Sequence, residues 1–295
     1  MPGSRRVDNQ WVGVGLYLIA LVAVVLISML VKATSDRVPV QQALLFRFGF
    51  CLLPLLLIGK LSREKLVLRT NRMGDYLIRS VAGISSIGLF FVAVGLIPLA
   101  TATAISYAAP IFCVVFSIPL LGERIGPRRW LAVVIGFFGV LIVSWPGSEI
   151  IHIGSIAGVG SAIGGALVVI YLRKMSDTES PLTTSLFYNA FGALVFLLWC
   201  SAIGWTPLTG NDLYWMIAIG LLAGIQQFCF ANAFRFAEAT FLAPFEYLTL
   251  VLAALAGFVF WGETPTSATW IGGIIIAAAG MFMLQRKSRI LRTQM

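Results

Sequence analysis

Ten long apolar blocks fill this sequence, and only short segments separate them. A helix that crosses a bilayer needs roughly 20 predominantly apolar residues, and blocks of this length can therefore span it. Only 11% of the 295 residues are charged, against about 25% in an ordinary soluble chain. We predict an all-α integral membrane protein with ten transmembrane helices. The blocks cover approximately residues 12–31, 41–59, 77–96, 99–121, 130–146, 153–172, 183–204, 213–234, 239–261 and 268–284.

The basic residues collect in alternate gaps between these blocks. With a cytoplasmic N-terminus, the inner segments hold 18 of the 21 Lys and Arg residues. The outer segments hold only Lys32 and Arg37, and Arg47 lies within the second block. The run from Lys60 to Arg79 is interpreted as a solvated cytoplasmic loop that touches anionic headgroups. Because basic residues favour the cytoplasmic side, we predict that both termini are cytoplasmic and that the chain resides in the inner cell membrane.

Several function classes find no support in the sequence. The net charge of +9 follows from the loop pattern, so nucleic acid is not an expected partner. The four cysteines lie inside apolar blocks without metal-ligand or redox spacing, and we expect no metal site and no cofactor. There is no P-loop for ATP and no nucleophile–base set for an intramembrane enzyme. Nor is there the filter or charged ring that a channel would need.

The second half of the chain repeats the first. Five spans in each half is an odd number, so the two halves have opposite orientations in the bilayer. Inverted repeats are typical of alternating-access transporters, which hold the substrate near the midplane between the halves. We predict a cytoplasmic N-terminus (1–11), a first repeat (12–147), a second repeat (152–285) and a basic cytoplasmic tail (286–295). Residues that match at an offset of 140 include Tyr107/Tyr247, Gly122/Gly262, Glu123/Glu263 and Trp130/Trp270, and Lys32/Lys174 match at an offset of 142.

These motifs resemble the EamA repeat of the drug/metabolite transporter superfamily. The elements Phe46-Arg47-Phe48 and Ala243-Pro-Phe-Glu-Tyr247 look most like the branch that includes S-adenosylmethionine and riboflavin importers. The resemblance implies a secondary carrier whose cavity is lined by the first four spans of each half, with the fifth and tenth spans used for packing or a homodimer contact. The first copy of the motif runs from Pro98 to Tyr107 and continues through Pro110, Leu121-Gly-Glu-Arg124, Trp130 and Gly136-Phe-Phe-Gly139, and the second runs from Ala239 to Tyr247 and continues through Trp261-Gly-Glu263 and Trp270-Ile-Gly272.

The predicted function is therefore secondary active transport of a small organic metabolite across the cytoplasmic membrane by alternating access. The substrate would be an amino acid derivative or a cofactor-like compound such as S-adenosylmethionine or riboflavin, with proton or exchange coupling. The family contains both importers and exporters, and an exporter of amino acids or drugs is the alternative. An intramembrane enzyme or a non-transporting membrane scaffold is a remote one.

Two charged residues inside spans are the sharpest site candidates. Arg47 lies about seven residues into a span, where a charge is costly unless it faces protein or water. It could hold an anion or pin another helix, or its head could snorkel to the interface. Glu246 could bind a cationic substrate, carry the coupling proton or lock a helix, or it could bond a backbone group freed by Pro244. By helix rise the two lie on the order of 10 Å apart along the membrane normal, so direct pairing is not expected.

The repeat extends this candidate set. Arg47 aligns with Asn189, and Ser106-Tyr107 aligns with Glu246-Tyr247. A pocket built from both halves would have a basic end, an acidic end and tyrosines between them, which suits a zwitterionic metabolite with an apolar or ring body. The remaining candidates are Tyr188, Gln226 and Asn232 for substrate contact or coupling, and Pro110 and Pro244 for helix kinks.

Overall fold

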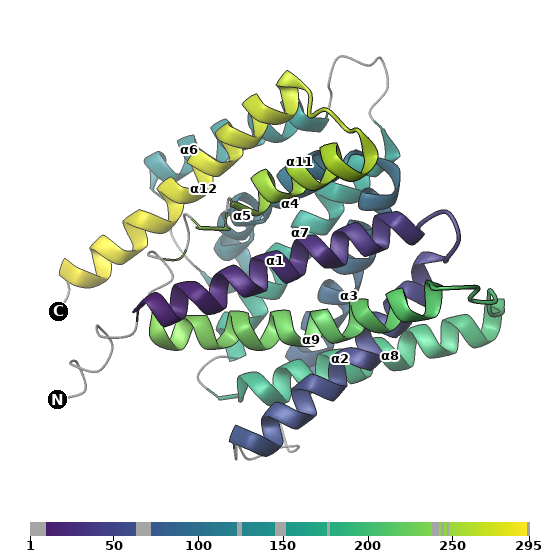
Figure 1. The fold of residues 1–295 in the computed structure, drawn as a ribbon. Helices are drawn as coiled ribbons and strands as arrows, with labels where there is room; N and C mark the ends of the chain where they lie inside the picture. Colours follow the sequence, from purple (N-terminus) through teal and green to yellow (C-terminus); the bar gives the residue numbers. More distant parts are fainter. Residues whose placement is uncertain are drawn as a thin grey trace.

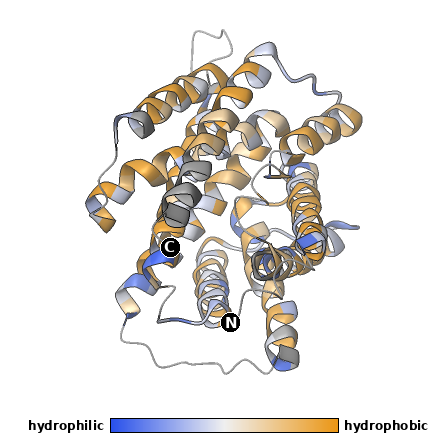
Figure 2. Ribbon diagram, turned by 90° about the vertical axis from the view of Figure 1, so that its left-hand side faces the viewer, coloured by the Kyte–Doolittle hydropathy of each residue, from blue (hydrophilic) through white to orange (hydrophobic). Residues whose placement is uncertain are grey.

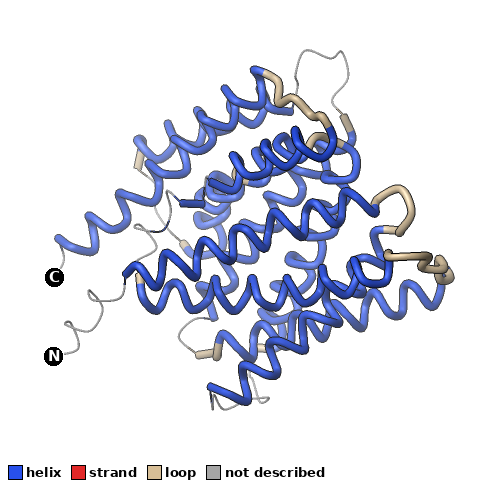
Figure 3. The backbone as a smooth tube through the Cα atoms, viewed as in Figure 1, coloured by secondary structure: helices blue, strands red, loops and turns tan. Residues whose placement is uncertain are grey.

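A computed structural model describes residues 10–62, 72–122, 126–144, 152–175, 178–237, 242, 245–246 and 248–293. Every regular element in these residues is an α-helix (Figure 3). The helices are α1 (Gln10–Thr34), α2 (Val40–Ser62), α3 (Met73–Leu96), α4 (Leu99–Ser106), α5 (Ala109–Leu121), α6 (Pro127–Ser144), α7 (Ile153–Met175), α8 (Pro181–Ile203), α9 (Asp212–Phe236), α11 (Leu248–Trp261) and α12 (Ser267–Thr293).

The helices are long and apolar enough to make this a multi-pass membrane protein. In the described part of the chain, seven helical segments meet the length and hydropathy of a membrane span, counting α4 and α5 together. Three shorter apolar helices lie at Trp130–Val143, Leu248–Trp261 and Ser267–Ala279. Hydrophobic residues cover most of the helix length, and hydrophilic residues gather toward helix ends and connections (Figure 2).

Glycines end the fourth and ninth predicted spans in the same way. α5 ends at Gly122 with φ +66°, and α11 ends at Gly262 with φ +65°. This left-handed conformation strains residues that carry a Cβ, whereas glycine adopts it readily and stops the helix. The repeated Gly-Glu pair of the sequence is thus a helix stop followed by a carboxylate. Glu123 lies outside the described residues, and Glu263 is placed below.

Helix packing follows the sequence repeat. α1 packs against α9, and the matching pair from the other half, α7 and α3, packs as well. α2 packs against its counterpart α8 and α6 against its counterpart α12, and the contact of α5 with α7 matches the contact of α11 with α1. Exchanging the two halves therefore maps these main contacts onto one another. The start of α1 and the end of α12 lie at the same end of the bundle (Figure 1).

The structure corrects one expectation of the sequence analysis, at Arg79. α3 begins at Met73, and Arg79 is only 7% exposed. The expectation that the basic run to Arg79 is a solvated loop is therefore wrong for Arg79, because it lies inside an apolar helix packed by α8. The predicted tail from residue 286 continues α12 as helix to Thr293.

Candidate functional site

The fourth predicted span is broken in the middle of the bundle. α4 ends at Ser106, Tyr107 and Ala108 form a turn, and Pro110 lies in the first turn of α5. Proline lacks a backbone donor and is well tolerated at this position of a helix. The Tyr107 hydroxyl donates a hydrogen bond of 2.7 Å to the backbone carbonyl of Glu246, directly before α11. The break in the first half is thus tied to the segment that carries Glu246 in the second. Pro244 and Tyr247 lie outside the described residues.

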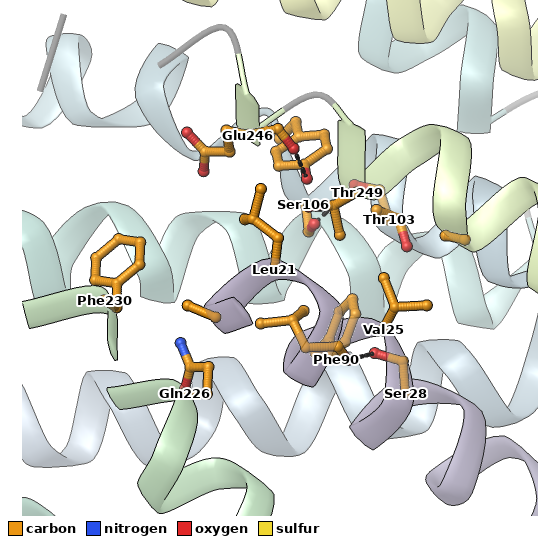
Figure 4. A pocket seen from close by; sticks show the side chains of 14 residues that line it. Leu21, Val25, Ser28, Phe90, Thr103, Ser106, Gln226, Phe230, Glu246 and Thr249 are labelled. Atoms are coloured by element: carbon orange, nitrogen blue, oxygen red, sulfur yellow. Dashed lines mark hydrogen bonds between the residues drawn. The ribbon is translucent and has the colours of Figure 1, made fainter. Parts of the chain in front are cut away.

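A cavity of about 190 Å³ lies beside this junction. Elements of both halves form its walls, because α1, α3 and α4 meet α9 and α11 there (Figure 4). Among the lining residues are Leu21, Ser28, Phe90, Thr103, Ser106, Tyr107, Gln226, Phe230, Glu246 and Thr249.

The charge of the cavity comes from one acidic side chain. Glu246 is the one charged side chain among its described lining residues. Within the described residues, no side chain or backbone group bonds the Glu246 carboxylate, and no carboxylate or basic group pairs with it. A single negative charge in an apolar wall attracts a cation, since a buried charge is costly without a partner.

The hydroxyl groups in the walls fall into two sets. Ser28, Thr103 and Ser106 each donate to a backbone carbonyl of their own helix, at 2.9, 2.7 and 2.7 Å. The buried Thr249 hydroxyl has no partner in the described structure. The groups left for a ligand are therefore the Glu246 carboxylate, the Thr249 hydroxyl and the Gln226 amide.

The sequence candidates divide between two places. Ser106, Tyr107, Gln226 and Glu246 line this cavity, whereas Arg47, Tyr188 and Asn189 are not among its lining residues. Asn189 donates to the Ser185 carbonyl at 2.8 Å and to the side chain of Gln227 at 3.1 Å. Gln226 and Gln227 are neighbours on α9, so this helix presents one glutamine to the cavity and the next to Asn189. Asn232 donates to the Phe228 carbonyl of its own helix at 2.9 Å and is not a lining residue.

An ion pair lies beyond the first residue of α4. Lys32 Nζ lies 2.7 Å from one Glu263 oxygen, and the other oxygen accepts a 3.0 Å hydrogen bond from the backbone N–H of Leu99, the first residue of α4. Lys32 also donates to the carbonyls of Val94 and Ile97. Glu263 thus caps a helix of the opposite half. Together with Lys32 it joins α1, α4 and the end of α11.

The sequence analysis did not single out two buried polar residues, Arg79 and Thr249. Arg79 was assigned to a loop by its basic neighbours, although the apolar stretch from Leu77 onward already flanks it. Thr249 lies in the apolar run of α11, and no charge or motif marks it.

Comparison with known proteins agrees with this architecture. A family model described as the EamA-like transporter family matches residues 11–145 and again 152–285. The chain is 27% identical to an S-adenosylmethionine uptake transporter of Rickettsia bellii, over 94% of this chain and 95% of that protein. It is 29% identical to a riboflavin transporter of Vibrio cholerae over 75% and 76%. It is also 29% identical to a pseudopaline exporter of Pseudomonas aeruginosa over 93% and 96%.

A solved crystal structure shares the fold. It superposes with a TM-score of 0.65 at 20% identity, covering 94% of this chain and 98% of its own. The two family matches fall on the two halves that the helix contacts relate, and they span nearly the whole chain. This chain belongs to the EamA-like transporter family, and it is a transporter rather than an enzyme.

Proposed function

We propose that this chain imports a small organic metabolite with a cationic group across the inner membrane by alternating access. Ten spans would form two inverted five-helix repeats, with α4 and α5 as one broken span and both termini in the cytoplasm. The exchange symmetry of the helix contacts supports the inverted repeats. The start of α1 and the end of α12 lie at the same end of the bundle (Figure 1). This arrangement and the basic inner segments support a cytoplasmic position for both termini.

The Glu246 carboxylate, which has no partner among the described residues and lines the cavity between the two halves, carries this proposal. An ammonium or sulfonium group would neutralise it, with the Gln226 amide and the Thr249 hydroxyl as further contacts. The rings of Tyr107 and Phe230 add faces that attract cations and stack on flat groups. The names of the S-adenosylmethionine uptake transporters among the relatives favour import over export.

Cavity size limits what this state can hold. A volume of about 190 Å³ is below the roughly 300–1,000 Å³ usual for drug-sized ligands. An amino-acid-sized cation fits the cavity as it stands, and a cofactor-sized substrate needs α1, α4 and α9 to separate. The Lys32–Glu263 pair holds α1 to α11 at one end, so substrate exchange at that end requires this pair to open. Proton or substrate exchange would drive the cycle.

Exposed apolar side chains on α6 and α12 fit the role of outer spans. Phe138 and Ile274, 59% and 63% exposed, would face lipid or a second copy of the chain.

Counterflow in proteoliposomes tests the proposal. Proteoliposomes that contain the purified chain are loaded with unlabelled S-adenosylmethionine, riboflavin or one of a panel of amino acid derivatives. Uptake of the same compound in labelled form is then measured. We expect saturable counterflow of at least one cationic compound, reduced by about a hundredfold in Glu246→Gln, since a charge-assisted contact is lost in a low-dielectric site. The control is Asp36→Asn, which removes a carboxylate from an exposed loop position. Equal transport by Glu246→Gln and Asp36→Asn would refute the role of Glu246.

A further inference from the structure

A second buried charge site lies among α2, α3 and α8, away from the Glu246 cavity. Arg47 on α2 is 6% exposed and Arg79 on α3 is 7% exposed. Both face Tyr188 on α8: the guanidinium carbon of Arg79 lies 3.9 Å from the centre of its ring, and Arg47 also interacts with its side chain. Two positive charges are therefore held close to one buried aromatic ring, and they repel one another.

Several N–H groups of these two arginines have no hydrogen-bond acceptor in the described structure. Arg47 Nη1 and Arg79 Nε and Nη1 are buried and make no hydrogen bond within the described structure. Over the same residues, neither arginine forms an ion pair. Two acidic side chains near the start of α3 and α8 are engaged elsewhere: Asp75 pairs with Lys174 at 3.0 Å, and Glu179 accepts a 2.7 Å hydrogen bond from the Tyr76 hydroxyl. Buried guanidinium groups without an anion are costly, particularly two that repel each other.

The surrounding packing holds the ring and the arginines in place. A Cβ at Gly83 would lie 2.8 Å from the Tyr188 ring, and a Cβ at Gly192 would lie 2.7 Å from the Phe48 ring. Phe48 in turn meets the Tyr188 ring edge-on, with 5.2 Å between centroids. Among the described residues, the other polar or titratable groups that border this region include Cys51, Tyr76, Asn189 and Gln227, none of which carries a negative charge to match the arginines.

We propose that Arg47 and Arg79 form an oxyanion-binding site, selective for a carboxylate or phosphate group and distinct from the Glu246 cavity. The guanidinium fork binds such groups through two parallel N–H donors, and two forks would share one anion. The anion would approach from the end of the bundle where α3 and α8 begin, past the Tyr76–Glu179 contact. The source is either a free anion from that compartment or the carboxylate of an amino-acid-type substrate.

Direct binding to the detergent-purified full chain tests this site. The probes are ¹⁴C-acetate and ³²P-labelled inorganic phosphate. We expect saturable binding of at least one probe, weakened about tenfold or more in Arg47→Gln and in Arg79→Gln. Arg79→Lys keeps the positive charge and should bind more strongly than Arg79→Gln. The matched control is Arg173→Gln at an exposed position of α7, which should bind as the parent does.

Displacement assigns the source of the anion. If methionine displaces the bound probe and methioninamide does not, the site takes a substrate carboxylate; if neither displaces it, the site holds a free anion. Glu246→Gln should leave probe binding unchanged, which separates this site from the proposed transport cavity. No saturable binding of either probe by the parent protein overturns the proposal, whatever the variants do. Equal binding by well-folded Arg79→Gln, judged by a single gel-filtration peak, also overturns it.

Discussion

The Glu246 cavity and the Arg47–Arg79 cluster are both buried and charged, yet they are built in opposite ways. Among the described residues, the cavity has free volume, one negative charge and polar groups without partners. The cluster carries two positive charges packed on a ring, with glycines that let helices and rings approach closely. We infer that the cavity should respond to changes of chemistry and the cluster to changes of volume. Four substitution pairs test this contrast, starting with the largest expected effect.

Removing an aromatic ring should cost far more in the cluster than beside the cavity. Tyr188 is 3% exposed and contacts Phe48 and Arg79, so Tyr188→Ala should lower the free energy of unfolding by about 3–5 kcal/mol. Phe230 is 38% exposed and borders the cavity, so Phe230→Ala should cost clearly less. Reversible unfolding in mixed micelles measures both. Equal losses would show that the two regions are packed alike.

Adding a single methyl group should also destabilise the protein more in the cluster than at an open position. Gly83→Ala places a Cβ 2.8 Å from the Tyr188 ring and forces the ring to move, at a cost of about 1–3 kcal/mol. Gly15→Ala is the matched control, because nothing lies within 4 Å of its added Cβ. There, the better helix propensity of alanine should leave stability equal or higher by up to ~1 kcal/mol. The same unfolding assay applies, and a neutral Gly83→Ala would argue against a tightly packed ring.

Much of the fold could be predicted from the sequence, because apolar length and motif spacing encode it. The first block, 12–31, lies within α1, and the repeated Gly-Glu pair marks the ends of α5 and α11. Pro110, which follows Tyr107 in the first turn of α5, indicates the helix break at Tyr107.

The division of polar residues between two sites could not be predicted. A helix that is apolar on all sides gives no periodicity to tell which face meets which neighbour. Gln226 and Gln227 illustrate this, because adjacent residues of α9 serve the cavity and Asn189 respectively. The burial of Arg79 was not predicted for another reason. A rule that counts basic residues in loops assigns Arg79 to a loop, although its surroundings bury it.

Removing the hydrogen bond that joins the two halves at the cavity should have an intermediate effect on stability. Tyr107→Phe removes the hydroxyl that donates to the Glu246 carbonyl, and one hydrogen bond contributes about 0.5–1.5 kcal/mol. Because this bond positions Glu246, counterflow should also slow. Tyr214→Phe is the control, since Tyr214 is 69% exposed. Matching melting temperatures and uptake rates for the two variants would mean that the bond does not position Glu246.

The smallest effects should separate two hydroxyls within the cavity itself. Thr249→Val keeps the shape of a buried side chain and removes a hydroxyl that has no partner in the described structure, so stability should hold while the substrate KM rises several-fold, by about one hydrogen bond. Ser106→Ala removes a hydroxyl already bonded to the Thr103 carbonyl, so KM should change less than about twofold, because that donor is not available to a ligand. Uptake against substrate concentration measures both. If Ser106→Ala raised KM as much as Thr249→Val, hydrogen-bond satisfaction in this state would not decide which groups contact the substrate, and the rearrangement between states would have to free the Ser106 hydroxyl.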